Sequence, residues 1–140
     1  MAELQVGLKH RESIKIDQSL LVPALPPIFS GMDDMPPVFA TCYLVSFTEW
    51  TCIQALKPYY LPGQRSVGTY LSINHTAAST PGMTVTIEVE LVELKGRLMQ
   101  FKVTARDDKD IISEGTHGRA LIDLAQFMAK VAEKAAGIQS

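Results

Sequence analysis

The chain has few of the residues that usually build metal centres and disulfide frameworks. Its 140 residues include two cysteines and three histidines, and these side chains are not clustered at the spacing of metal ligands. We therefore expect no metal site. Cys42 and Cys52 would lie about 15 Å apart on a helix, which is too far for a disulfide bond. Both should be free thiols.

Runs of positive charge and long apolar segments are also missing. The net charge is -2 at pH 7, and lysine and arginine are scattered. Surfaces that bind nucleic acid or an anionic membrane are normally dense in positive charge, so we expect neither partner. No stretch reaches the apolar length of a membrane span, and residues 1–10 lack the apolar core of a signal peptide. The protein should therefore be cytoplasmic.

The composition is that of a globular protein, with 46% hydrophobic and 20% charged residues. The length suits a single domain over residues 1–140. Alternating apolar residues predict a first strand at 10–22, and β-branched, alternating patterns predict four more strands within 67–122. Helical spacing predicts a short amphipathic helix at 124–136, packed against the sheet.

Residues 23–37 carry five prolines, which excludes regular helix or strand there. This segment is nevertheless rich in apolar side chains: Leu25, Ile28, Phe29, Met32 and Met35. A loop of this composition is unlike a simple polar linker. We expect it to fold over another part of the molecule as a flap.

Residues 38–57 form a predicted helix that is apolar on every side. Such a helix is normally buried, and the only layer available to cover it is the predicted antiparallel sheet. The expected fold is therefore an α+β hotdog fold, in which a curved sheet of about five strands wraps around one central helix. Sheets of this kind leave an unpaired edge, and pairing of edges across a two-fold axis predicts a homodimer.

Glu49 is the one ionisable carboxylate in the middle of this helix. Burial of an ionised carboxylate is costly unless it is paired or hydrogen-bonded. Proteins use such burial to tune carboxylates for acid–base or nucleophilic chemistry, which makes Glu49 a candidate catalytic residue. The alternative is a glutamate that reaches the surface or bonds a partner in the core.

Four further residues are candidates for the same site. Strand alternation places His75 on the helix-facing side, where it could pair with Glu49 or be a satisfied core residue. Thr41 lies about two turns before Glu49, near helix-start amides that favour negative charge, or it is an ordinary capping residue. Gly68 interrupts its strand, as happens where a ligand approaches or where a strand twists. Arg119 shares a strand face with His117 and could bind a cofactor phosphate, a surface carboxylate or a second subunit.

Three strings resemble a known family in their order and spacing: VFATCYLVSFTEWTC, VGTYLSINHTAASTPGMTVTIEVEL and SEGTHGRALI. They are similar to the fluoroacetyl-CoA thioesterases, which are hotdog-fold hydrolases. The resemblance implies hydrolysis of a short acyl-CoA without any cofactor. It also implies a catalytic set of Thr41, Glu49 and His75, in which Thr41 polarises the thioester, Glu49 is nucleophile or general base, and His75 is base and charge stabiliser. Gly68 matches a glycine that lines the thioester site.

The flap departs from the family pattern. Fluoroacetyl-specific members carry aromatic residues where this chain has Met32 and Met35. Methionine is flexible and fills irregular space, so we expect a looser lid and a broader range of short acyl groups. The predicted substrate-binding residues are Gly68, Met32, Met35, Phe39 and Arg119. A non-catalytic module that binds acyl-CoA or another small ligand on the same fold is the alternative function.

Overall fold

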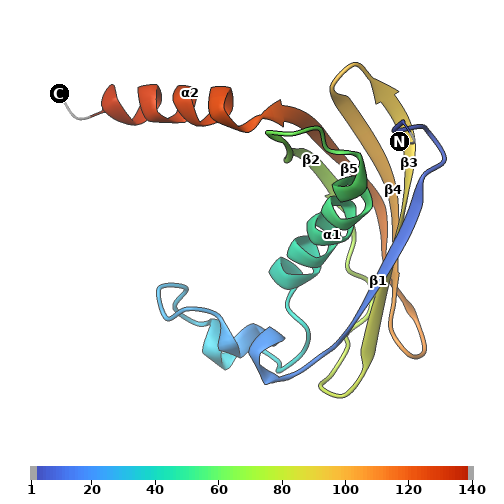
Figure 1. Cartoon of the computed structure of the whole chain (residues 1–140). Coiled ribbons are helices and arrows are strands. Elements are labelled where there is room, and N and C mark those ends of the chain that lie inside the picture. Colours follow the sequence, from blue (N-terminus) through green and yellow to red (C-terminus); the bar gives the residue numbers. More distant parts are fainter. Residues whose placement is uncertain (1–2, 139–140) are drawn as a thin grey trace.

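Five antiparallel strands form one curved sheet in the computed structural model, which describes residues 3–138 (Figure 1). The strands lie in the order β1-β3-β4-β5-β2. Their bounds are Lys9–Lys15 for β1, Gln64–Ile73 for β2, Thr84–Lys95 for β3, Leu98–Arg106 for β4 and Ile111–Asp123 for β5. Short turns make hairpins of β3 with β4 and of β4 with β5. The β2–β3 connection is different, because it leads from one edge strand to a strand on the far side of the sheet.

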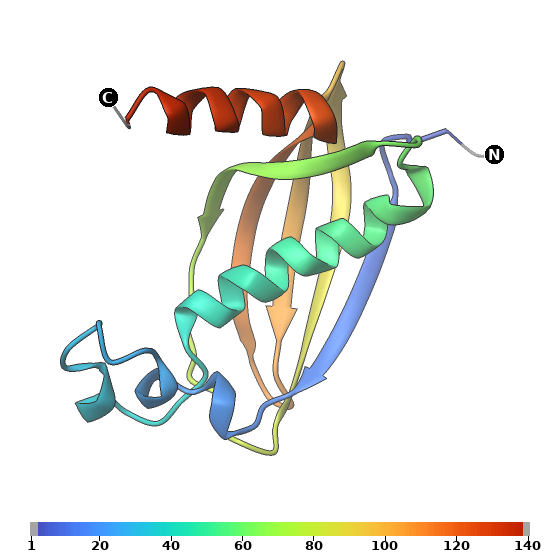
Figure 2. The same ribbon diagram turned by 60° about the vertical axis from the view of Figure 1, so that its left-hand side comes forward.

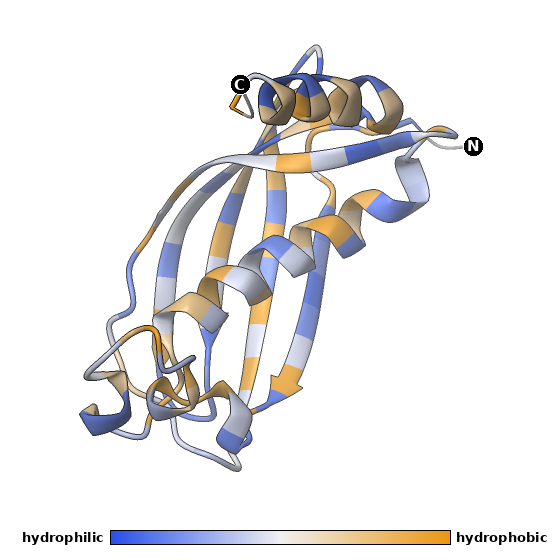
Figure 3. Cartoon of the chain, turned by 90° about the vertical axis from the view of Figure 1, so that its left-hand side faces the viewer, coloured by the Kyte–Doolittle hydropathy of each residue, from blue (hydrophilic) through white to orange (hydrophobic). Residues whose placement is uncertain are grey.

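The helix α1, Thr41–Leu56, lies across the concave face of this sheet (Figure 2). Along β3 and β4 hydrophobic and hydrophilic residues alternate (Figure 3), as expected for strands with one buried face. The buried members of the two strands are Val85, Ile87, Val89, Leu91, Met99, Phe101, Val103 and Ala105. They join the inner side of α1 in a single core, which confirms the predicted α+β hotdog fold.

The expectation that α1 is buried on every side is wrong within one chain. Leu44, Phe47 and Cys52 face the core, whereas Ser46 is exposed and Trp50 keeps 41% of its surface accessible. The reason is architectural, since the sheet provides only one layer and no other described element covers the outer side of the helix. The outer side of α1, which includes the exposed Trp50, is thus left in contact with solvent.

The first strand is shorter than predicted and ends at Lys15. The chain then enters two 3₁₀ turns, Gln18–Leu20 and Val22–Ala24. The first is capped by the Asp17 side chain, which accepts a hydrogen bond from Ser19 N, and the second has a proline in its first turn. A third turn, Met32–Asp34, lies near the tip of the flap. Apolar alternation alone had extended the strand into residues that belong to these turns.

The flap, residues 23–37, is closed at its neck by main-chain hydrogen bonds. Val22 N donates to Val38 O at 3.0 Å, and Ala40 N donates to Leu20 O at 2.9 Å. These bonds hold the flap at the start of α1, where it protrudes beyond the sheet (Figure 2). Its apolar tip is open, with Ile28 82% and Phe29 53% exposed. The predicted folding of the flap over another part of the molecule is therefore not seen within one chain.

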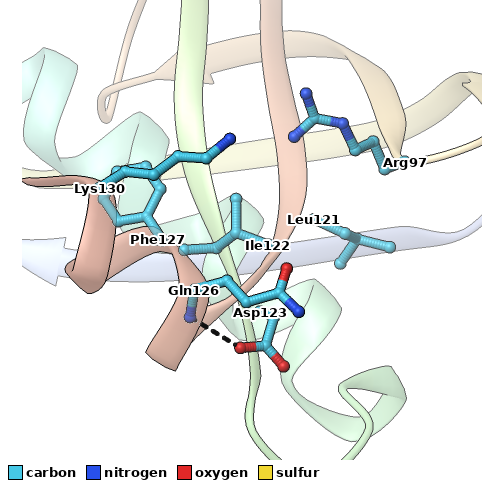
Figure 4. A pocket seen from close by; sticks show the side chains of 7 residues that line it. All are labelled: Arg97, Leu121, Ile122, Asp123, Gln126, Phe127 and Lys130. Carbon is cyan, nitrogen blue, oxygen red and sulfur yellow. Dashed lines mark hydrogen bonds between the residues drawn. The ribbon is translucent and has the colours of Figure 1, made fainter.

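The C-terminal helix α2, Leu124–Ala136, has no buried residue and projects away from the sheet (Figure 1). The prediction that it packs against the sheet is therefore wrong, although its amphipathic pattern is correct. Its first turn is capped by Asp123, which accepts a hydrogen bond from Gln126 N at 3.0 Å (Figure 4). A surface cleft of about 310 Å³ lies beside this turn, with the lining residues Arg97, Leu121, Ile122, Asp123, Gln126, Phe127 and Lys130.

Within residues 3–138, none of the helices combines the length and the apolar character required to cross a membrane.

The β2–β5 pairing predicts a strict requirement for glycine at position 115. A Cβ atom at Gly115 would overlap the carbonyl oxygen of Ser72 and lie 2.8 Å from the Cα of Ile73. Gly115→Ala should therefore reduce the free energy of unfolding by about 1–3 kcal/mol, the usual cost of overpacking, or more. Chemical denaturation measures this. Gly137→Ala is the matched control, because its Cβ would meet nothing closer than 3.5 Å. Equal stabilities of the two variants would contradict the prediction.

Candidate active site

Glu49 lies on α1 beside a buried arginine. Nη1 of Arg119 donates to Oε2 of Glu49 at 3.0 Å. The arginine side chain is only 3% exposed, whereas the glutamate side chain is 41% exposed. The expected cost of a buried carboxylate is thus reduced in two ways, by partial exposure and by an ion pair. Oε1 of Glu49 accepts no hydrogen bond from the described residues.

Arg119 is held by several acceptors at once. Its Nε donates to Oγ of Ser66 and its Nη2 donates to the Ser66 carbonyl oxygen, both at 2.9 Å. Its Nη1 also lies 3.1 Å from Nε2 of His117. The Ser66 hydroxyl is in turn 2.6 Å from the Tyr60 hydroxyl. The guanidinium group is therefore rigidly placed beneath the carboxylate.

This placement corrects one expectation for Arg119. The strand β5 lies between β4 and β2, and the Arg119 side chain is only 3% exposed, so within the described chain it makes no contact at the surface. Arg119 does pair with a carboxylate, but this is not the expected surface ion pair, because the arginine side chain is buried. Its expected role in substrate binding stays a prediction. The shared strand face of His117 and Arg119 is also confirmed by their direct contact.

A bulge in β2 turns Gly68 toward the helix. The register pairs Gly68 with Arg119 and Leu71 with His117, with a shift between Gly68 and Tyr70. Directly paired residues share a face, so Gly68 and Leu71 both face α1 although they are three positions apart. Strict alternation along the strand, which places His75 on the helix-facing side, would put Gly68 on the opposite face, and the bulge makes that expectation wrong. A Cβ at Gly68 would lie 2.8 Å from Oε2 of Glu49.

Thr41 and His75 form a second polar pair at the start of α1. The Thr41 hydroxyl lies 2.8 Å from Nδ1 of His75. The other ring nitrogen, Nε2, is buried and has no hydrogen-bond partner among the described residues. Phe39 packs edge-on against the imidazole, with ring centroids 6.2 Å apart. Burial lowers the pKa of His75, so its neutral form is favoured.

The predicted pairing of Glu49 with His75 is absent within the described chain. The polar partner of Glu49 is Arg119, and that of His75 is Thr41. The physical reason is the length of the helix, since the eight positions from Thr41 to Glu49 correspond to about 12 Å. One chain therefore carries two separate polar groups. The first is the Thr41–His75 pair and the second is the Glu49–Arg119–His117 group.

A cavity of about 200 Å³ opens at Glu49, with the lining residues Val45, Glu49, Gly68, Tyr70, Leu71 and His117. The remaining predicted site residues lie elsewhere. Met32 and Met35 are on the flap and are 37% and 46% exposed. Phe39 is 1% exposed, a position that suits support of His75 better than contact with a ligand. Cys42 and Cys52 are free, as expected, and burial raises the pKa of Cys52 to about 12.

Comparison with known proteins identifies the family of this chain. The family model described as "Fluoroacetyl-CoA-specific thioesterase" matches residues 27–125. The fluoroacetyl-CoA thioesterase of Streptantibioticus cattleyicolor is 40% identical over 131 residues, which cover 94% of each chain. The chain belongs to the fluoroacetyl-CoA-specific thioesterase family. It is thus a thioester hydrolase with a hotdog fold.

Solved structures support the assignment to this family. A mutant fluoroacetyl-CoA-specific thioesterase in complex with fluoroacetate and CoA is 39% identical, with a TM-score of 0.86 over 89% of this chain and 99% of that chain. A thioesterase superfamily member from Thermus thermophilus is 20% identical, with a TM-score of 0.88 over 99% of this chain and 98% of that chain. The second likeness concerns the fold alone.

Sequence reasoning missed the contacts that His117 and Ser66 make with Arg119. His117 was noted only as a neighbour of Arg119, and Ser66 was not considered. The sequence did carry a signal for these contacts. His117 and Arg119 are two positions apart on a strand, so both must face the core or both must face away from it. An arginine and a histidine that face a core require acceptors and donors there.

The enclosed His117 and the partly buried His75 predict that the fold loses stability when the pH is lowered from 7 to 5. Burial lowers the pKa of His75 and of His117 from the ordinary value of about 6.5. Below pH 6.5 the unfolded chain therefore binds protons before the folded chain does. For His117 the loss is at most about 1.4 kcal/mol per pH unit between its two pKa values.

Urea denaturation at pH 7, 6 and 5 measures this loss. The double variant with His75→Gln and His117→Gln should show a flatter pH dependence than the natural chain. The same slope in both proteins would contradict the prediction.

Proposed function

We propose that this thioesterase hydrolyses short-chain acyl-CoA to the carboxylate and free coenzyme A. Membership of the fluoroacetyl-CoA-specific thioesterase family supports the CoA thioester as substrate. The cavity at Glu49 is only about 200 Å³, which suits a small acyl group better than a long chain. Fluoroacetyl selectivity is not part of the proposal, since Met32 and Met35 occupy the flap positions where fluoroacetyl-specific relatives are expected to have aromatic rings.

The Glu49 carboxylate is the observation that carries the proposal. Arg119 anchors Oε2, so the free oxygen, Oε1, is left for chemistry at the cavity. Gly68 gives the carboxylate room, because a Cβ there would lie within 2.8 Å of Oε2. A partly exposed, oriented carboxylate beside a small cavity is what a general base or a nucleophile requires.

Two routes are compatible with this arrangement. As general base, Oε1 takes a proton from water, the water oxygen adds to the thioester carbonyl carbon, and the C–S bond breaks to release the CoA thiolate. As nucleophile, Oε1 itself attacks that carbon to form a mixed anhydride, which water then hydrolyses. In both routes Thr41 and His75, brought to the cavity by the second copy proposed below, polarise the carbonyl oxygen. The thiolate takes up the proton that the attacking water gives up. Neither route requires a metal or a redox cofactor.

Glu49→Gln should reduce thiol release by at least about a hundredfold, because the amide can act neither as base nor as nucleophile. A chromogenic thiol reagent and a panel of short acyl-CoA substrates measure this loss. Glu93→Gln is the control, since Glu93 has a 52% exposed side chain on β3 and should leave the rate unchanged. Undiminished turnover by Glu49→Gln would remove Glu49 from the mechanism. Saturable binding in calorimetry without thiol release across the panel would favour the non-catalytic binding module.

We also propose that the protein works as a homodimer joined along β2 and the outer side of α1. The outer edge of β2 is unpaired in the described chain, and exposed Trp50 and Tyr70 lie on these two elements. Pairing of the two β2 edges would provide partners for their free main-chain groups, and the contact would bury the exposed aromatic side chains. The helix α2 follows β5 and reaches beyond the sheet, where a second copy would lie (Figure 1).

The dimer would also reunite the two polar groups. A two-fold axis near Val45, midway between Thr41 and Glu49, would place the Thr41–His75 pair of one copy beside Glu49 of the partner subunit. The active site would then take residues from both copies. We further propose a cytoplasmic location, where two free thiols suit the reducing conditions.

A shared site predicts complementation between two inactive variants. Chains with Thr41→Val and chains with Glu49→Gln should each be inactive alone. After unfolding and refolding together in equal amounts, half of the dimers should be mixed, and each of these should have one intact site. The mixture should therefore recover about a quarter of the natural activity. A Trp50→Asp change in both chains, which places a charge in the interface, should prevent recovery. Failure to recover activity in confirmed mixed dimers would place the site within one chain.

A further inference from the structure

His117 is the only histidine of this chain that is fully enclosed, at 2% exposure, and both of its ring nitrogens have partners. It lies on β5 under the cavity at Glu49. Nδ1 is 2.7 Å from the carbonyl oxygen of Tyr70, and Nε2 is 3.1 Å from Nη1 of Arg119. None of the roles proposed above uses this side chain.

The partners fix the protonation state of His117. A carbonyl oxygen can only accept a hydrogen bond, so Nδ1 must carry a proton and donate it to Tyr70 O. A guanidinium nitrogen can only donate, so Nε2 must be unprotonated and accept from Arg119. Only the neutral ring with its proton on Nδ1 satisfies both contacts.

We propose that His117 is a positioning residue for the thioester hydrolysis assigned above: as a neutral acceptor it fixes Arg119, which in turn orients Glu49. Nη1 of Arg119 has two protons, and the described partners use both, one on Nε2 of His117 and one on Oε2 of Glu49. The angle between these protons is set by the planar guanidinium group. The position of the Glu49 carboxylate therefore depends on Nε2 of His117 accepting a hydrogen bond from Arg119.

Protonation of His117 would break this link. A proton on Nε2 would point at Nη1 and place two cations about 3 Å apart, so Arg119 would have to turn away from its present position. Burial, together with the charge of Arg119, lowers the pKa of His117. The neutral, orienting form is therefore retained somewhat below the ordinary titration range of histidine, and activity should fall when that form is lost in acid.

Other charged groups around the imidazole do not replace His117. The helix α1 contributes Glu49 and Cys52, and the Cys52 thiol stays uncharged because burial raises its pKa to about 12. From β5 comes Arg119, and β2 contributes the carbonyl oxygen of Tyr70, whose hydroxyl lies 3.0 Å from that of Thr116. The strand β4 places the apolar residue Phe101 opposite His117.

Two variants of similar size separate positioning from packing. Gln can offer an acceptor near the place of Nε2, but it does not titrate. Asn can keep the donor to Tyr70 O, but it ends before Arg119. For His117→Asn we expect kcat to fall about tenfold or more with a smaller change in KM, as for loss of a hydrogen bond to a charged group. For His117→Gln we expect kcat at pH 8 within about threefold of the natural value. When kcat/KM is plotted against pH, the acid side should show one ionisation fewer than in the natural enzyme.

The kinetic outcomes decide the proposal when thioester hydrolysis is measurable. The proposal would be overturned if His117→Asn had the same kcat as the natural enzyme. It would also be overturned if kcat/KM of His117→Gln and of the natural enzyme fell in the same way at acid pH. Thermal melting of each variant shows whether it is folded. If His117→Asn does not fold, the comparison of acid limbs between His117→Gln and the natural enzyme remains decisive.

A second readout does not need activity. In the ¹⁵N-labelled natural protein, two-dimensional NMR of the histidine rings should show His117 protonated on Nδ1 and unprotonated on Nε2 at pH 7, with a midpoint of titration below 6.5. A ring protonated on Nε2 at pH 7 would overturn the proposal. The expected NMR result together with no hydrolysis of any acyl-CoA would instead contradict the proposed function and leave the hydrogen-bonded arrangement intact.

Discussion

The ion pair between Arg119 and Glu49 joins the two layers of this fold at one point. Arg119 belongs to a central strand and is enclosed, whereas Glu49 belongs to the helix and is half exposed. A charge on the inner face of a sheet is tolerated only when most of its donors are satisfied, and Ser66, His117 and Glu49 together accept from four of the five N–H groups of Arg119. The position of the Glu49 carboxylate at the cavity depends on this arrangement.

The bulge in β2 is the second local feature on which the site depends. Without the extra residue, Gly68 and Leu71 could not both face α1, and the pairing of Gly68 with Arg119 would not continue into that of Leu71 with His117. Bulges are common beside active sites because they redirect a side chain without breaking the sheet. Here the bulge brings the residue without a side chain against the carboxylate that needs space.

The strand and helix patterns were sufficient to predict the architecture, because one apolar helix and one alternating sheet have few ways to bury their surfaces. Glu49 and Arg119 were each selected from the sequence, but not as partners, because their contact joins residues 70 positions apart and no local pattern encodes it. His75 was assigned to the correct face but to the wrong partner, because its distance from Glu49 depends on how α1 crosses the sheet. The bulge also escaped prediction, since one extra residue leaves the composition of a strand unchanged.

The flap separates two tasks that often compete within one enzyme. Its neck is fixed by main-chain hydrogen bonds, which do not depend on side-chain identity, and its exposed tip contributes nothing to the core. Residues at the tip can therefore be exchanged during evolution at little cost in stability and without moving Glu49, Arg119 or His117. In this chain the tip is thus the segment where a change of sequence is least coupled to the fold around Glu49.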